Sequence, residues 1–243
     1  AGFMHVFEFT ALAAKLPAAI LGLLTLIVVY NFGKTLFNRT AGFIAAFCLL
    51  TTVHFLYYSR MAMTDVPNLF FITLALYLYY LAKLSGKFKF WLWSGVMVGL
   101  AVMTKGVVGL IPFAVIGLYE LYLFFTKQQK LDFWLINRYI SFFVISLVVF
   151  MPWHIYMYNV YGMTFVNQYL GYHVLARATE AIEDKGQPWW WYFVVLRVSM
   201  RIWFVALIAS IPWFIYNPAV VIMSAWLFVI MKRYLDSDSG QFK

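Results

Sequence analysis

Apolar runs long enough to cross a bilayer follow one another along this chain, with short polar segments between them. A membrane-spanning helix needs about 20 predominantly apolar residues, or about 17 at the least. Backbone polar groups in lipid must bond within the segment itself, so the runs predict helices. The sequence therefore predicts an all-α polytopic transmembrane bundle of about seven spans. The runs are 16–33, 41–58, 66–82, 91–104, 107–126, 139–157 and a last stretch of 189–231.

Two of these runs have features of their own. The 91–104 run is short for a span, and it contains Gly95 and Gly99 at the spacing that lets two helices approach closely. The 189–231 stretch is long enough for two helices, and its prolines predict a break near Pro212 or at Asn217-Pro218.

The composition excludes an ordinary soluble domain. Hydrophobic residues make up 65% of the chain and charged residues only 11%, against about 45–50% apolar residues in a soluble domain. The lipid bilayer is therefore the first partner that we expect. The sequence contains no nucleotide-binding glycine loop and no zinc-type His/Cys spacing, and no basic run alternates with exposed aromatic residues. We therefore expect no nucleic-acid partner and no set of protein side chains that binds a metal ion. The motifs imply no certain cofactor, and a divalent metal is left open as a possible one.

The basic residues predict the orientation, because cytoplasmic loops carry an excess of Lys and Arg. The segments 34–40, 83–90 and 127–138 hold eight basic residues and the single acid Asp132: Lys34, Arg39, Lys83, Lys87, Lys89, Lys127, Lys130 and Arg138. This charge excess predicts an integral membrane protein whose other loops lie outside. We expect it in the plasma (inner) membrane, with the active site facing outside, on the periplasmic face. We expect a transmembrane core over 1–231, with an external loop at 158–188 and a polar tail at 232–243.

The predicted external face collects cations and carboxylates. Arg60 and Asp65 share one short loop, and Lys105 sits at a turn between two apolar runs. His173 and Arg177 lie in the 158–188 segment, four residues apart. Such charges commonly cap helix ends and reach water by snorkelling. They are also what an anion-binding site requires, because anion recognition needs convergent cations.

Several segments, in order along residues 8–192, resemble the polyprenyl-phosphate-dependent glycosyltransferases of the protein O-mannosyltransferase superfamily (GT-C type). The bacterial members that this chain resembles most are the 4-amino-4-deoxy-L-arabinose lipid A transferases. The matching segments are Glu8-Phe9…Lys15-Leu16-Pro17-Ala18-Ala19, Phe37-Asn38-Arg39-Thr40-Ala41-Gly42, Ser59-Arg60-Met61-Ala62-Met63-Thr64-Asp65, Gly95…Gly99-Leu100-Ala101…Thr104-Lys105-Gly106, Met151-Pro152-Trp153-His154 and Tyr172-His173…Arg177 with Gly186-Gln187-Pro188-Trp189-Trp190-Trp191-Tyr192. Lys15 stands where the family usually has Arg.

The resemblance implies a membrane enzyme that moves a sugar from a polyprenyl-phosphate donor to a lipid, glycan or protein acceptor in one inverting displacement. The implied donor-phosphate ligands are Arg60, Lys105 and Arg177, with Asp65 as a supporting carboxylate. Glu8 and His173 are further candidates for the same site. The family's main catalytic carboxylate lies upstream of the Leu16-Pro17 segment, so we expect the general base in residues that precede this sequence.

Two alternatives stay open on the sequence. External cations would also serve a transporter or flippase core for an anionic lipid, and the chain could be an inactive fragment of the enzyme. A transporter typically contains inverted repeats, and the sequence shows no second copy of the Arg60-to-Lys105 pattern. The enzyme is therefore the favoured interpretation.

Overall fold

The described part of the chain is built from helices alone, as the apolar runs predict. A computed structural model describes residues 11–126, 133–169, 171 and 190–216. Its elements are α2 (Ala11–Leu36), α3 (Arg39–Thr51), α4 (Val53–Tyr58), α5 (Asp65–Ser85), α6 (Phe88–Lys105), the 3₁₀-helix η1 (Gly106–Leu110), α7 (Ile111–Phe125), α8 (Phe133–Val166), α10 (Trp191–Met200) and α11 (Ile202–Tyr216). The all-α prediction is confirmed for these residues.

Four of the described helical segments are long and apolar enough to cross a membrane: Ala11–Leu36, Asp65–Ser85, Phe88–Phe125 and Leu135–Tyr169. Their outward faces expose large apolar side chains, such as Leu23 on α2, Leu118 on α7 and Val148 on α8. A protein that turns such side chains outward on most of its helices is solvated by lipid. The chain is therefore a helical membrane protein.

The helix boundaries differ from the seven apolar runs at three places. The 41–58 run divides at Thr52, whose extended backbone (φ −71°, ψ 123°) ends α3 and begins α4. The 107–126 run begins with η1, so α7 has only 15 residues. The 91–104 run belongs to the 18-residue α6, which is about 27 Å long at 1.5 Å per residue and so nearly matches the apolar thickness of a bilayer.

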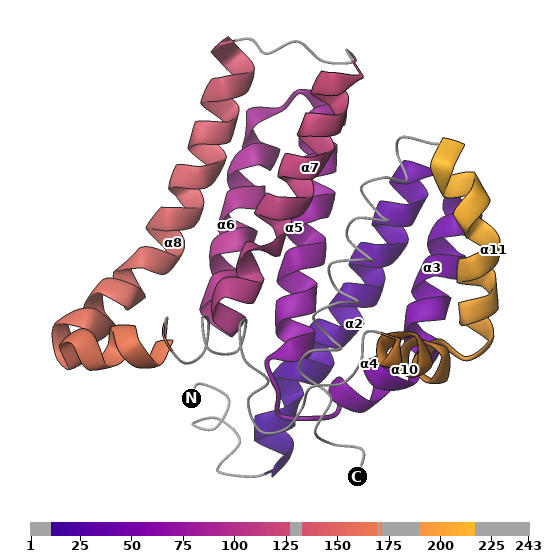
Figure 1. Cartoon of the computed structure of the whole chain (residues 1–243), viewed down its shortest axis with the longest axis horizontal. Coiled ribbons are helices and arrows are strands. Elements are labelled where there is room, and N and C mark those ends of the chain that lie inside the picture. Colours follow the sequence, from indigo (N-terminus) through magenta and orange to yellow (C-terminus); the bar gives the residue numbers. More distant parts are fainter. Residues whose placement is uncertain (1–10, 127–132, 170, 172–189, 217–243) are drawn as a thin grey trace.

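Within the described part of the last stretch, 190–216, the helical path breaks at Arg201 and not at Pro212. Arg201 has a left-handed backbone (φ 51°) and separates α10 from α11, while Pro212 lies inside α11. Asn217-Pro218 lies outside the described residues. Figure 1 shows α10 end-on beside a lengthwise α11, so α10 crosses the direction of the long helices. An exposed Arg197 on α10 fits a helix lying along the membrane surface.

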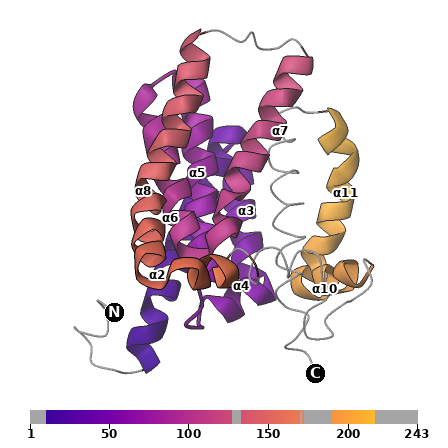
Figure 2. The ribbon, with the colours of Figure 1, turned by 60° about the vertical axis from the view of Figure 1, so that its left-hand side comes forward.

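The long helices run alternately in opposite directions (Figures 1 and 2), and α2 packs against α3 and α5, α5 against α6, and α6 against α8. Gly95 and Gly99 form the α6–α8 contact. A Cβ at Gly95 would lie 2.6 Å from the carbonyl oxygen of Phe142, and one at Gly99 would lie 2.5 Å from Cβ of Val149. The prediction that this glycine pair permits a close helix approach is confirmed.

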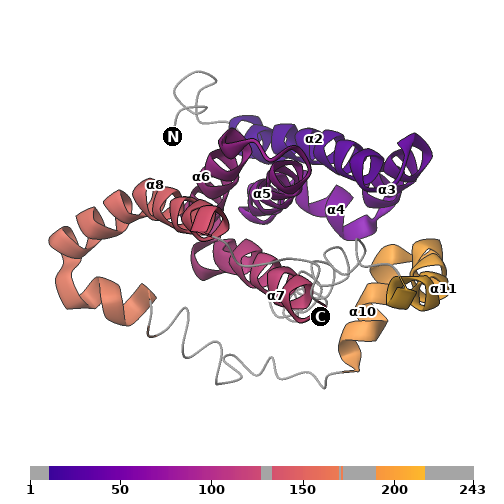
Figure 3. The ribbon, with the colours of Figure 1, turned by 90° about the horizontal axis from the view of Figure 1, so that it is seen from above.

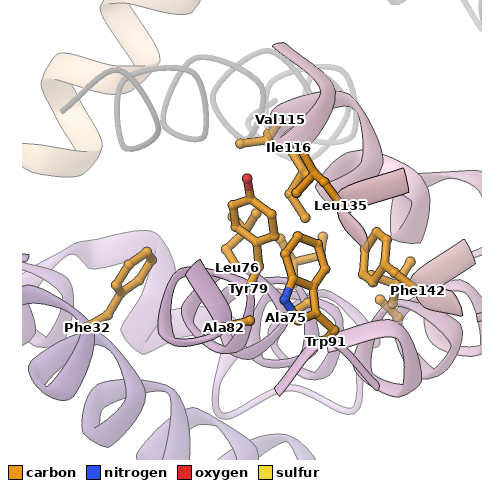
Figure 4. Packing of buried hydrophobic residues seen from close by; sticks show 13 residues of the cluster. Phe32, Ala75, Leu76, Tyr79, Ala82, Trp91, Val115, Ile116, Leu135 and Phe142 are labelled. Atoms are coloured by element: carbon orange, nitrogen blue, oxygen red, sulfur yellow. The ribbon is translucent and has the colours of Figure 1, made fainter. Parts of the chain in front are cut away.

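An aromatic core fills the middle of the bundle, between α5, α6, α7 and α8 (Figure 4). Trp91 and Tyr79 are fully buried and meet edge to face with ring centroids 5.4 Å apart. Phe142 on α8 is buried beside them and contacts the ring of Phe113 on α7. This core fixes the relative positions of α5 and α6, whose ends carry the candidate site.

Seen from above in Figure 3, α8 extends away from the other helices at its C-terminal end. Its helical path contains Pro152 and a turn at Gly162 (φ 55°, ψ −138°). Since α8 continues to Val166, residues 158–166 of the predicted external loop at 158–188 belong to a helical path that is interrupted only at Gly162. Residues 172–189 lie outside the described residues, as do Glu8 and the 232–243 tail.

Candidate functional site

An ion pair joins the start of α5 to the end of α6. Asp65 is the first residue of α5 and Lys105 is the last residue of α6. Because the two helices are antiparallel neighbours, these termini meet at one end of the bundle, where Lys105 Nζ donates to Asp65 Oδ1. A carboxylate at a helix N-terminus and an ammonium at a helix C-terminus are each stabilised by the local helix dipole. The fold therefore supports both charges at this place.

The ion pair is only partly open to its surroundings. The side chain of Lys105 is 27% exposed and that of Asp65 is 16% exposed. One turn into α5, the amide of Asn68 is buried, and its Oδ1 lies 3.2 Å from the hydroxyl oxygen of Thr104. A second polar contact therefore ties α5 to α6 directly beside the ion pair. It restricts the relative movement of the two helix ends.

Arg60 belongs to the same end of the bundle, in the connection between α4 and α5. Its backbone N–H donates to the carbonyl of Tyr57 over 3.1 Å, which closes the turn after α4. Its side chain is exposed and forms no ion pair with any described residue. The guanidinium is therefore available to an anion that approaches the Lys105–Asp65 pair.

The turn after Lys105 contacts the far end of α8. Gly106 has a left-handed backbone (φ 59°), and Tyr169 lies directly against it. The hydroxyl of Tyr169 lies 3.1 Å from Nε2 of His154. His154 occurs in a segment that carries the family resemblance, but no sequence pattern predicts a role for His154 or Tyr169. Their proximity to Lys105 depends on the turn of α8 at Gly162, which no sequence pattern indicated.

The structure thus brings two of the six predicted site residues into contact and places a third at the same end of the bundle. Asp65 and Lys105 form the ion pair, and Arg60 lies in the connection that leads into Asp65. The other three, Glu8, His173 and Arg177, lie outside the described residues. Within 11–126, 133–169, 171 and 190–216 no group of three His, Cys, Asp or Glu side chains is arranged to hold a metal ion.

A second ion pair lies at the opposite end of α5. Lys83 Nζ is 3.0 Å from Glu120 Oε1, and the hydroxyl of Tyr79 donates to the same carboxylate. The side chains of Lys83 and Glu120 are 20% and 15% exposed, nearly as covered as the first pair. This pair ties α5 to α7 and lies about 27 Å along α5 from Asp65, at 1.5 Å per residue. It resembles the Lys105–Asp65 pair in type and burial, yet it is remote from Arg60 and Tyr169.

A bundle of membrane-crossing helices whose two ends carry charged side chains defines an integral membrane protein, and the Lys105–Asp65 pair marks one of these ends as a polar candidate site. The comparisons with known proteins identify its family. The family model described as dolichyl-phosphate-mannose-protein mannosyltransferase matches residues 1–156, and the chain belongs to this family, whose members are membrane glycosyltransferases of the GT-C kind.

One relative covers most of the chain. A protein of Aquifex aeolicus (strain VF5), whose description is "Uncharacterized protein", is 28% identical over 199 residues. That similarity covers 80% of this chain but 37% of the relative, so the chain spans little more than a third of the relative's length. No solved structure matches the chain.

Proposed function

We propose that the complete protein transfers a sugar from a polyprenyl-phosphate donor to an acceptor hydroxyl at the bundle end that carries Arg60, Asp65 and Lys105. The observation that carries the proposal is the ion pair between Lys105 and Asp65, which holds a cation and a carboxylate together at one end of the helix bundle of a protein from a glycosyltransferase family. A lipid phosphate sits at headgroup depth, which is where the ends of membrane-crossing helices lie.

The chemistry requires charge stabilisation at the leaving group. The acceptor oxygen attacks the anomeric carbon of the sugar, the bond between that carbon and the phosphate oxygen breaks, and the bonding electrons leave with the polyprenyl phosphate. The acceptor proton passes to a general base, which we assign to the upstream carboxylate of the family. Cations held near the leaving oxygen lower the barrier as negative charge develops there.

We assign the leaving phosphate to Lys105, Arg60 and Arg177. An ammonium group has three N–H donors, and Asp65 accepts from Lys105 with one carboxylate oxygen, so donors remain for a phosphate. Asp65 is a positioning residue in this scheme, because it holds the ammonium at the helix ends. His173 and Glu8 stay candidates for the same site.

The distribution of basic residues supports an external location for this site. Five of the basic residues that predicted the cytoplasmic side lie at or beside the α2–α3 and α5–α6 connections, at the end opposite Lys105: Lys34, Arg39, Lys83, Lys87 and Lys89. By the positive-inside rule that end faces the cytoplasm. We therefore place the reaction at the outer face of the plasma membrane.

The test uses the full-length protein reconstituted in vesicles with polyprenyl-phosphate-mannose, a lipid-phosphate sugar of the same kind as the dolichyl-phosphate-mannose in the family description. We expect the wild-type protein to release polyprenyl phosphate when an acceptor is supplied. Lys105→Ala should abolish this release while leaving membrane insertion intact, because its ammonium contacts the leaving group. Unchanged turnover in Lys105→Ala would refute the assigned role.

Lys83→Ala is the matched control, because it also removes the cation of a partly covered ion pair at an end of α5. Both variants should lose similar amounts of stability, since each leaves one carboxylate without its cation. Only Lys105→Ala should lose transfer. Equal losses of activity in the two variants would show that the ion pairs serve the fold alone.

A further inference from the structure

The end of α8 returns to the candidate site through a sharp turn. Gly162 has a left-handed backbone within α8 (φ 55°), and the helical path continues beyond it to Tyr169. This path brings the Tyr169 ring against Gly106, the residue that follows Lys105. An aromatic hydroxyl therefore lies against the backbone that directly follows Lys105, although Tyr169 and Lys105 are 64 positions apart along the chain.

The contact leaves no room for a side chain at Gly106. A Cβ built on Gly106 would lie 2.7 Å from the hydroxyl oxygen of Tyr169 and 3.3 Å from the ring carbon that bears it. The left-handed backbone of Gly106 is itself unfavourable for any residue with a Cβ. Glycine at this position thus permits the phenol oxygen of Tyr169 to reach the backbone beside Lys105.

His154 determines which way the Tyr169 proton points. Nδ1 of His154 is 2.8 Å from the carbonyl oxygen of Phe150. A carbonyl oxygen only accepts hydrogen bonds, so Nδ1 carries the proton in the neutral imidazole. Nε2 then has no proton and accepts from the Tyr169 hydroxyl over 3.1 Å. The rings of Phe165 and Trp153 pack around the imidazole and keep it in this orientation.

The oxygen of Tyr169 is left as an acceptor, because its only proton is given to His154. An acceptor does not stabilise a phosphate, which offers only acceptor oxygens, but it binds a hydroxyl group well. The Lys105 ammonium, one residue before Gly106, donates to Asp65 and keeps N–H donors for a ligand phosphate. A hydroxyl group on the ligand whose phosphate reaches Lys105 would supply the donor that the Tyr169 oxygen accepts from.

We propose that Tyr169 is a specificity-determining residue whose oxygen, oriented by His154, accepts a hydrogen bond from a hydroxyl of the sugar that the donor carries. This inference rests on the proposed function, because it assumes that the sugar lies next to the phosphate held at Lys105. The cations bind the phosphate and do not distinguish between sugars. Tyr169 would distinguish a sugar that has one particular hydroxyl from a sugar that lacks it.

The experiment compares polyprenyl-phosphate-mannose with its singly deoxygenated derivatives, using full-length wild-type protein and Tyr169→Phe. For one derivative, the wild-type kcat/KM should fall about 2- to 13-fold, the effect of one neutral hydrogen bond. Tyr169→Phe should lose that discrimination, so that it handles mannose and this derivative equally. Tyr158→Phe, which changes an exposed tyrosine on the same helix, is the matched control and should discriminate as the wild type does.

Two variants of His154 keep the test decisive if Tyr169→Phe does not fold. His154→Gln retains a side-chain oxygen that accepts from the Tyr169 hydroxyl, so it should keep the discrimination, whereas His154→Leu should lose it. Equal discrimination in all folded variants would overturn the inference while leaving the proposed function intact. A wild-type protein that transfers no sugar from any of a panel of polyprenyl-phosphate sugars, mannose included, would overturn both.

Discussion

Replacing Gly99 by Ala tests whether the contact between α6 and α8 holds the bundle together. A Cβ at this position would lie 2.5 Å from Cβ of Val149, 2.7 Å from its Cγ1 and 3.0 Å from the carbonyl oxygen of Ser146. Ordinary carbon contacts are about 3.5–4.0 Å, so α8 has to move by roughly 1 Å. The nearest atom is a Cβ, which is fixed to the backbone and cannot rotate away.

The size of the effect follows from overpacking. Inserting one carbon into a well-packed contact costs about 1–3 kcal/mol. A glycine-to-alanine change also gains about 1 kcal/mol of helix propensity, which conceals part of that cost. Gly117→Ala corrects for this gain, because Gly117 lies in α7 and a Cβ there would meet nothing within 4 Å. The difference between the two variants should therefore be about 1–3 kcal/mol, with Gly99→Ala the less stable.

The assay is equilibrium unfolding of the purified protein in mixed micelles, with circular dichroism reporting the helical content. Gly99→Ala should unfold at a lower fraction of denaturing detergent than the wild type, and Gly117→Ala at the same fraction or a higher one. If the two variants unfolded together, α8 would not pack against this face of α6, and the close approach at Gly99 would be refuted.

Two further stability changes follow from contacts outside the core, measured by the same assay. Asn38→Ala removes the side-chain oxygen that caps α3 and should cost about 1 kcal/mol, whereas Asn38→Asp should be nearly neutral because it keeps an acceptor. Trp203→Phe removes the 2.7 Å hydrogen bond from the indole to the hydroxyl of Thr51 and should lower the free energy of unfolding by about 0.5–1.5 kcal/mol. Thr51→Val removes the same hydrogen bond and should lower it by the same amount. The double variant should be no less stable than either single variant. Additive losses in the double variant would show that this hydrogen bond does not join α11 to α3.

The fold class and the α6–α8 contact could be predicted because they depend on local patterns. Apolar length predicts a membrane helix, and the spacing of Gly95 and Gly99 predicts a close helix approach without knowledge of the partner helix. The breaks were harder to predict. Thr52 ends α3 with nothing in the sequence around it that normally stops a helix, and Arg201 rather than Pro212 separates the last two described helices. Hydropathy does not indicate such breaks, because the residues on both sides of each break are similarly apolar.

The candidate site could be predicted in part, for the same reason. The alternation of spans puts Arg60, Asp65 and Lys105 on one face of the membrane. Whether two of those charges touch depends on the lengths and registers of α5 and α6, which the apolar runs fix only to within several residues. Tyr169 could not be predicted at all, because its position depends on the turn at Gly162 inside a run that otherwise reads as one continuous helix.

The pairing of Lys105 with Asp65 changes how the cation should be understood. From the sequence, a lysine between two apolar runs implied an external anion, yet the chain itself supplies a carboxylate. The carboxylate of Asp65 lowers the net charge of the proposed site by one, so that site would attract a phosphate less strongly than its cations alone would. In the proposed function, the transferase must release polyprenyl phosphate after every turnover. Binding that is equally tight in the ground state and in the transition state does not make the chemical step faster. A carboxylate that moderates the cation while holding it in place therefore fits an enzyme better than it fits a site built only to retain an anionic lipid.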